Sequence, residues 1–220
     1  MRNVAAMPLE YSCFISYRNH EQSELAEKFI DDLASALRSE LAVRIEEDLF
    51  VDRAGIPGGA FYNPVLARAL CKSACMIAVY TPTYFSRKHL YCAREYYAME
   101  TLERLRLSRL KQQLSKQCGL IIPIVLRGGE YLPAAIKNKR QCYTFERFSL
   151  TSRRLSHNTT FEGQIRAIAD DVHTRWRMFA HAGADLTSDC ENFKLPSETK
   201  IQAWLDGMIQ PMSPFPFRAS

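Results

Sequence analysis

Two side chains that could contact a ligand, Tyr17 and Arg18, follow a short apolar run near the start of the chain. The run itself, Cys13-Phe14-Ile15, has no polar alternation, which is typical of a strand covered on both faces in a parallel sheet. Ligands of such sheets bind beyond the carboxyl ends of the strands, so both residues lie where a ligand would be. On spacing alone, we nevertheless interpret them as ordinary loop residues.

A glycine-rich segment follows the second apolar run. Gly55, Pro57, Gly58 and Gly59 lie within a few residues of each other, which predicts a loop with special backbone dihedrals. Such a loop after a strand can bind phosphate. The segment matches neither G-x-G-x-x-G nor G-x-x-x-x-G-K-[ST], so neither standard phosphate-binding loop is predicted.

Cysteine and histidine give no sign of a metal site or a nucleophile. The seven cysteines form no C-x-x-C pair, and no His/Cys/Asp cluster has metal-ligand spacing. His20 and His89 lie in predicted loops, and we interpret both as surface residues. Most cysteines lie in apolar runs, and we interpret them as buried, reduced thiols of a cytoplasmic protein: Cys13, Cys71, Cys75, Cys118 and Cys142.

The elements that would position these residues alternate along the chain. Strand-like apolar runs recur near residues 13–17, 49–52, 75–80, 119–126 and 142–145. Between and after them, apolar residues three or four apart indicate amphipathic helices near 19–40, 65–70, 91–117 and 159–176. This alternation predicts an α/β fold, a five-stranded parallel sheet with helices on both faces and right-handed crossovers.

Local signals add detail to this prediction. Asn19 with Gln22, and Thr159 with Glu162, fit the caps of the first and last of these helices. Pro123 interrupts a strand and indicates a bulge or a missing ladder bond. The second half of the helix over 91–117 is basic without interleaved aromatics, so we expect a solvated face there rather than a nucleic-acid site. Its basic residues are Arg104, Arg106, Arg109, Lys111 and Lys116.

Composition is that of an ordinary soluble globular protein, with 47% hydrophobic and 24% charged residues and a net charge of +5. We divide the chain into an N-terminal tail (1–10), one domain (11–180) and a C-terminal extension (181–220). The extension holds a short amphipathic helix near 201–209, capped by Ser197, and a proline-rich tail. It either packs back on the domain, which we favour, or engages a partner. We expect no signal peptide and no membrane span.

Five segments resemble, in order and spacing, the motifs of TIR (Toll/interleukin-1 receptor-like) domains of the bacterial type. Tyr91-Cys92-Ala93-Arg94-Glu95 is similar to the W-x-x-x-E motif, with tyrosine in place of tryptophan. The resemblance covers about residues 11–180 and implies the three-layer, flavodoxin-like TIR fold. The other four segments are Phe14 to Arg18, Phe50 to Asp52 followed by Gly55 to Gly59, Ser73 to Ser86, and Ile122 to Ile124.

The resemblance also implies a site. The family's catalytic glutamate falls on Glu95, although a glutamate near a helix start is by itself typical of a favourable surface charge. Residues that line the family's nucleotide pocket fall on Tyr17, Arg18 and Phe61, and Tyr91 keeps an aromatic wall.

The loop through which family members contact one another falls on the glycine-rich segment. Pro57 stands where some animal relatives have an acidic residue, so no second carboxylate is expected. The implied interaction loop consists of Gly55, Ile56, Pro57, Gly58 and Gly59.

Enzymatic members of this family cleave NAD+ at the nicotinamide–ribose bond. One carboxylate suffices for this, because nicotinamide is already cationic in NAD+ and leaves as a neutral molecule without the general acid that most glycoside hydrolysis needs. A carboxylate stabilises the positive charge that grows on the ribose. We expect Glu95 to be ionised near the helix start, Arg18 to meet a phosphate, and Phe61 or Tyr91 to stack on a ring.

The implied function is an NAD+ glycohydrolase or ADP-ribosyl cyclase in bacterial antiphage signalling, acting in the cytoplasm. Its products are nicotinamide and ADP-ribose or a cyclic isomer, with NAD+ as substrate and no cofactor. We expect self-association through TIR–TIR contacts, and an activating sensor or a downstream effector protein. The alternative is a non-enzymatic TIR–TIR interaction scaffold. A nucleic-acid binder would show a steep salt dependence, which we do not expect.

Overall fold

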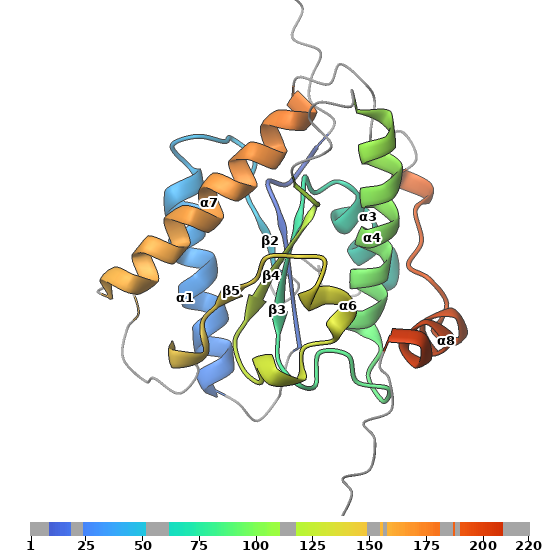
Figure 1. Cartoon of the computed structure of the whole chain (residues 1–220). Coiled ribbons are helices and arrows are strands. Elements are labelled where there is room, and N and C mark those ends of the chain that lie inside the picture. Colours follow the sequence, from blue (N-terminus) through green and yellow to red (C-terminus); the bar gives the residue numbers. More distant parts are fainter. Residues whose placement is uncertain are drawn as a thin grey trace, which may run out of the picture.

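The computed structural model describes residues 9–18, 24–51, 62–110, 118–148, 155, 158–180, 187 and 190–208. Its centre is a sheet of five parallel strands in the order β2-β1-β3-β4-β5 (Figure 1). Every residue of the three central strands is buried, as the unbroken apolar runs predict. The strands are β1 (Phe14–Tyr17), β2 (Phe50–Val51), β3 (Met76–Tyr80), β4 (Ile121–Val125) and β5 (Tyr143–Thr144).

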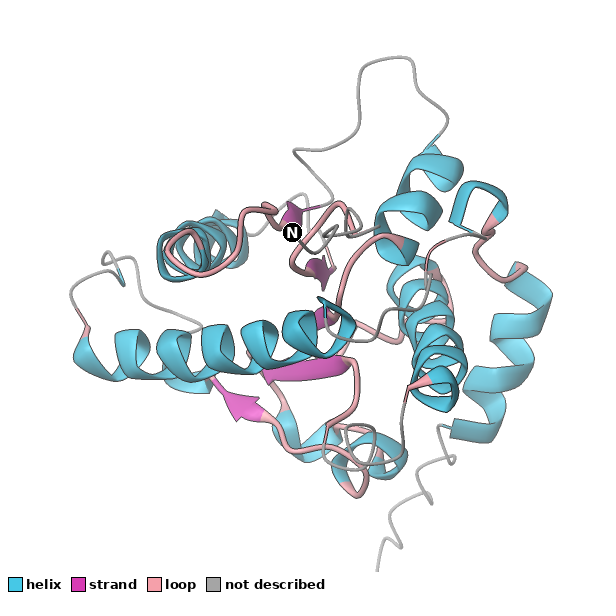
Figure 2. Ribbon diagram, turned by 90° about the horizontal axis from the view of Figure 1, so that it is seen from above, coloured by secondary structure: helices cyan, strands magenta, loops and turns pink. Residues whose placement is uncertain are grey.

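The sheet has helices on both faces, which confirms the predicted α/β, flavodoxin-like architecture. The helices α1 (Glu24–Leu41) and α7 (Thr159–Ala180) contact each other on one face. The helices α3 (Tyr62–Cys71) and α4 (Tyr91–Arg109) lie together on the other (Figures 1 and 2). Among the described residues, no helix is both long and apolar enough to cross a bilayer.

The apolar stripe predicted for the first helix faces the sheet. Phe29, Leu33, Leu37 and Leu41 are all buried, because residues four apart lie on one face of a helix. Some of the predicted positions lie outside the described residues, among them the cap pair Asn19 and Gln22, His20, and the basic residues Lys111 and Lys116.

Pro123 sits in β4 without a bulge. It pairs in register with Ala78 in an uninterrupted five-residue ladder. Of the two expected alternatives, a bulge or a missing ladder bond, the bulge is therefore wrong. The Leu120 carbonyl and the Leu126 N–H both bond to β3, so residue 123 faces β5 by alternation. The pairing of β5 begins only at Ile124. The missing N–H of proline therefore lies where no ladder bond is needed.

The cap of α7 differs from the predicted one. The Asn158 side-chain oxygen accepts hydrogen bonds from the backbone N–H of Thr160 (3.0 Å) and of Phe161 (3.1 Å). Thr159 is the first helical residue, so the predicted capping box of Thr159 and Glu162 is wrong by one position. Asparagine is as good a cap as serine and better than threonine, which explains the shift.

The basic half of α4 is not uniformly solvated. Arg104 is exposed, but Arg106 is only 1% exposed, so the prediction of a solvated face is wrong for Arg106. It lies one turn after the buried Leu102, on the apolar face. Its guanidinium donates hydrogen bonds to the Ser73 carbonyl (2.8 Å) and the Cys71 carbonyl. These bonds provide donors for carbonyl groups at the end of α3, which have no partner within the helix.

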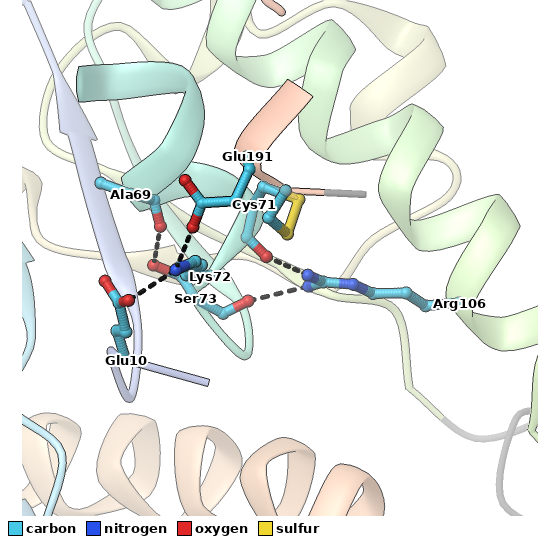
Figure 3. Close-up of a disulfide and its surroundings, with 8 residues drawn as sticks. Glu10, Ala69, Cys71, Lys72, Ser73, Arg106 and Glu191 are labelled. Carbon is cyan, nitrogen blue, oxygen red and sulfur yellow. Dashed lines mark hydrogen bonds and ion pairs between the residues drawn. A yellow bond between two sulfur atoms is a disulfide. The ribbon is translucent and has the colours of Figure 1, made fainter. Parts of the chain in front are cut away.

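A disulfide joins Cys71, the last residue of α3, to Cys190 in a 3-10 turn, η4 (Cys190–Asn192) (Figure 3). The prediction of a reduced thiol is wrong for Cys71. Its partner is 119 residues away, beyond what cysteine spacing can show. Disulfides are rare in the cytoplasm, so this pairing is not what the predicted location implies. The free cysteines of the described residues are Cys13, Cys75, Cys92, Cys118 and Cys142.

The described part of the C-terminal extension packs on the domain, as favoured from the sequence. Its helix α8 (Glu198–Met208) contacts α4, and the Ser197 hydroxyl accepts the N–H of Lys200 at 3.4 Å, as expected of the cap. Trp204 lies 6.0 Å from the Phe85 ring and 6.1 Å from the Tyr96 ring, centroid to centroid. The extension therefore rests on α4 and on the loop after β3.

Candidate functional site

The predicted site residues that the structure describes gather at the carboxyl ends of β1 and β3. Tyr17 ends β1, and Arg18 follows it. The loop over 81–90 follows β3 and leads into α4, which carries Glu95. This edge is the lower one in Figure 1, where β1 and β3 pair although they are not consecutive in sequence. Such a point of reversed strand order is where doubly wound folds bind their ligands.

Glu95 is a buried residue rather than a surface one. Its exposed fraction is 3%, although a glutamate near a helix start is usually solvated. Helix α4 begins at Tyr91, so Glu95 is its fifth residue and lies beyond the first turn. The helix dipole acts mainly within that turn, so the expected stabilisation by the dipole is at most a minor contribution.

Two buried hydroxyls lead to the Glu95 carboxylate. The Ser16 hydroxyl, on β1, donates a hydrogen bond to Glu95 Oε2 at 2.6 Å. The same Ser16 oxygen lies 2.6 Å from the Tyr84 hydroxyl. A serine hydroxyl has one proton, and Ser16 gives it to the carboxylate, so the phenol of Tyr84 must be the donor in the second bond.

Both hydroxyls are shielded from water, with exposed fractions of 0% for Ser16 and 1% for Tyr84. Burial, and then the nearby Cys92 and Glu95, raise the pKa of Tyr84 well above its ordinary value. The phenol therefore keeps its proton at neutral pH and remains a donor. Hydrogen bonds that point at a carboxylate favour its ionised form.

Arg18 is tied to the same loop. Its Nη1 donates a hydrogen bond to the Thr83 carbonyl at 3.3 Å, directly before Tyr84. Its Nε is shielded and has no hydrogen-bond partner among the described residues. Tyr17 is 8% exposed and belongs to the core of the strand as much as to its end. A guanidinium at this edge of the sheet is suited to an anionic group.

Tyr91, the first residue of α4, forms the exposed rim of this group of residues. Its side chain is 46% exposed, and the Arg94 guanidinium carbon lies 5.9 Å from its ring centroid. Arg94 also donates to the Pro196 carbonyl at 2.8 Å, which links the rim to the extension. Phe61 and the predicted interaction loop, Gly55, Ile56, Pro57, Gly58 and Gly59, lie outside the described residues, so their predicted roles stay predictions.

Ser16 and Tyr84 were not predicted as site residues. Ser16 is a polar residue at the end of an apolar run, and Tyr84 stands among loop aromatics. These signals were present, but only the fold shows that the two side chains meet Glu95, which is 79 residues from Ser16 in sequence.

The arrangement offers electrostatic chemistry. No group of three His, Cys, Asp or Glu side chains within the described ranges could hold a metal ion. A shielded carboxylate attracts positive charge more strongly than a solvated one, because the local dielectric constant is lower. Glu95 is therefore suited to stabilise a cation that forms beside it.

No protein-family model matches the chain, and no curated protein matches it. Among solved structures, it is similar to the TIR domains in the structure of the activated Roq1 resistosome directly recognizing the pathogen effector XopQ. The identity is 16% and the TM-score 0.36, over 90% of this chain and 99% of that chain. A likeness at this identity and TM-score assigns neither a family nor an activity to the chain.

Proposed function

We propose that the chain is a TIR-domain enzyme that cleaves NAD+ at the nicotinamide–ribose bond. The observation that carries the proposal is Glu95, a 3%-exposed carboxylate that accepts a buried hydroxyl donor at the carboxyl edge of the sheet. It occupies the glutamate position of the motif that resembles W-x-x-x-E. Buried carboxylates at ligand-binding edges are candidates for catalysis, because burial has a cost that function can justify.

The reaction needs little from the protein besides charge and position. The C–N bond breaks with its electron pair going to the pyridinium nitrogen, and nicotinamide leaves neutral. Glu95 stabilises the positive charge that develops on the ribose. Water then adds to give ADP-ribose with loss of a proton, or a nucleophile of the same molecule adds to give a cyclic isomer.

In this proposal, Arg18 binds a phosphate of NAD+, and Tyr17, Tyr91 and Phe61 contact its rings. The position of Arg18 directly after β1, at the carboxyl edge of the sheet, supports the first of these roles. The exposed ring of Tyr91 supports a stacking role at the rim. Self-association through the loop Gly55–Gly59, and with it a role in immune signalling, belong to the same proposal.

The test is NAD+ turnover by the concentrated full-length protein beside Glu95→Gln. We expect wild type to release nicotinamide, and Glu95→Gln to lose about 100-fold or more in kcat, because only the charge is removed. Glu100→Gln is the matched control on the same helix and should retain activity. Thermal unfolding must show that both variants are folded.

Activity of folded Glu95→Gln at the wild-type level would reject the proposed role of Glu95. Absence of turnover by wild type, together with self-association, would instead support the interaction scaffold. Specific activity that rises with protein concentration would support assembly of the active form, whereas full activity at high dilution would contradict it.

A further inference from the structure

A chain of two hydroxyls ends on Glu95, and its members come from three elements. Tyr84 lies in the loop after β3, Ser16 in β1 and Glu95 in α4. Both links measure 2.6 Å, which is at the short end for hydroxyl hydrogen bonds. All three residues are at most 3% exposed.

The direction of the hydrogen bonds is fixed by the proton count. Ser16 donates to Oε2 of Glu95, so it can only accept from Tyr84. Each bond polarises the next one, and in a low-dielectric interior such chains are stronger than separate bonds. The two hydrogen bonds thus orient Oε2 of Glu95 from β1, and a hydrogen bond donated to a carboxylate favours its ionised form.

The same loop also contacts Arg18, the proposed phosphate-binding residue. Arg18 follows β1 directly and donates to the Thr83 carbonyl, next to Tyr84. The position of the Tyr84 phenol is further fixed by aromatic packing, with the Phe85 ring centroid 4.8 Å from its own. The loop therefore contacts both Arg18, through the Thr83 carbonyl, and the hydroxyls that lead to Glu95, through Tyr84.

We propose that Ser16 and Tyr84 are positioning residues for Glu95, which they orient through the chain Tyr84 O–H to Ser16 O–H to Glu95 Oε2. The inference rests on the proposed NAD+-cleaving function. Neither hydroxyl needs to touch the substrate. Their effect appears in the transition state, where the carboxylate must lie close to the ribose cation, since small misplacements of a catalytic group reduce the rate strongly.

The experiment compares kcat and KM for NAD+ in Ser16→Ala, Tyr84→Phe and the double variant. We expect kcat to fall about tenfold to 100-fold in Ser16→Ala and less in Tyr84→Phe, with KM unchanged, because the lost interaction acts in the transition state. The double variant should match Ser16→Ala alone. Once the Ser16 hydroxyl is removed, the hydrogen-bonded connection from Tyr84 to the carboxylate is broken, so the two losses do not add.

Two matched controls separate this role from simple loss of buried hydroxyls. Ser73→Ala removes another 0%-exposed serine, whose hydroxyl donates to the Ala69 carbonyl. Tyr80→Phe removes the hydroxyl of a neighbouring buried tyrosine, which donates to the Tyr131 carbonyl. Both controls should keep the wild-type kcat per folded molecule.

Each outcome decides between the two proposals. If wild type consumes NAD+ and Glu95→Gln does not, while Tyr84→Phe and Ser16→Ala keep kcat, the positioning role is wrong and the proposed function stands. If kcat falls only in proportion to the folded fraction, or if losses add in the double variant, the hydroxyls are merely structural. If wild type never consumes NAD+, both proposals fall. Tyr84→Phe removes a single oxygen atom, so it tests the chain even if Ser16→Ala does not fold.

Discussion

Strand β1 has a carboxylate near each of its ends, one exposed and the other buried. Before the strand, Glu10 lies at the surface and pairs with Lys72 Nζ at 2.6 Å and with Arg68 at 3.1 Å. Beyond it, Glu95 is buried and accepts a hydrogen bond from the neutral hydroxyl of Ser16. Lys72 also pairs with Glu191 at 2.7 Å, next to the disulfide (Figure 3).

The difference separates stability from chemistry. At the amino end of the sheet, ion pairs and a disulfide connect the end of α3 to η4, and the Arg106 guanidinium connects it to α4. These contacts stabilise the fold. At the carboxyl end, the Ser16 hydroxyl donates a hydrogen bond to the buried Glu95 carboxylate and orients it. A shielded charge attracts a nearby cation more strongly than a solvated one, so the second arrangement is the one suited to stabilising a substrate cation.

The largest expected effect on stability comes from the disulfide. Cys190→Ser should lower the free energy of unfolding by about 3 kcal/mol, because the bond closes a long loop in the unfolded chain. Denaturant unfolding measures it. A dithiol reductant should lower the stability of wild type similarly and leave Cys190→Ser unchanged. NAD+ turnover per folded molecule should stay constant, and a loss of turnover in the folded variant would contradict the separation of the two ends.

A smaller effect is expected from the buried guanidinium at the same end. Arg106→Met should cost about 2 kcal/mol, because the carbonyls of Cys71 and Ser73 lose their donors. Arg104→Met on the exposed side of the same helix should change stability by less than about 0.5 kcal/mol. Equal stability of the two variants in denaturant unfolding would show that Arg106 does not hold the end of α3.

The smallest effect is expected from the exposed ion pairs. Burial raises the pKa of Glu10, but hydrogen bonds and charges from Lys72 and Arg68 outweigh this and lower it below its ordinary value of 4.5. Its contribution to stability is therefore present above that pH and is lost as the pH falls through the lowered pKa. The pKa of Lys72 is raised above 10.5, chiefly by Glu10, so the contribution persists at neutral and mildly basic pH.

Glu10→Gln should remove this part of the pH dependence of stability. It should lower the free energy of unfolding at neutral pH by less than about 1 kcal/mol, since the ion pair is partly exposed. Thermal unfolding between acid and neutral pH, at low and high salt, measures it. High salt should weaken the effect through screening. If stability depends on pH in the same way in wild type and Glu10→Gln, the ion pairs of Glu10 do not contribute. The amino end of the sheet would then be stabilised by the disulfide and Arg106 instead.

Predictions from the sequence held where a single local pattern decides the structure. The unbroken apolar runs around Phe14 and Ile77 can only be buried strands, and the stripe from Phe29 to Leu41 can only face a sheet. Pro123 shows the limit of such reasoning. Proline removes one hydrogen-bond donor, but whether that donor is needed depends on where β5 begins to pair with β4. The two strands are separated by 17 residues, so the sequence around Pro123 does not show this.

The candidate site was predictable only in part. The resemblance to TIR motifs pointed to Glu95, and it also pointed to Tyr17 and Arg18, which spacing alone left as ordinary loop residues. Burial of Glu95, and of Arg106 on the same face of α4, could not be read from residue type, since both types are usually solvated. The role of Asn158 as the cap of α7 depended on where the helix starts, which sequence signals fix only to within a residue or two.

The sequence by itself determined the alternation of strands and helices, because burial of apolar side chains follows a period that can be read along the chain. The tertiary structure alone decided which distant groups meet: Ser16 and Tyr84 at Glu95, and Cys190 at Cys71. Hydrogen bonds and disulfides need atoms within a few ångströms of each other. That proximity is created by strand order and helix packing, neither of which any local pattern encodes.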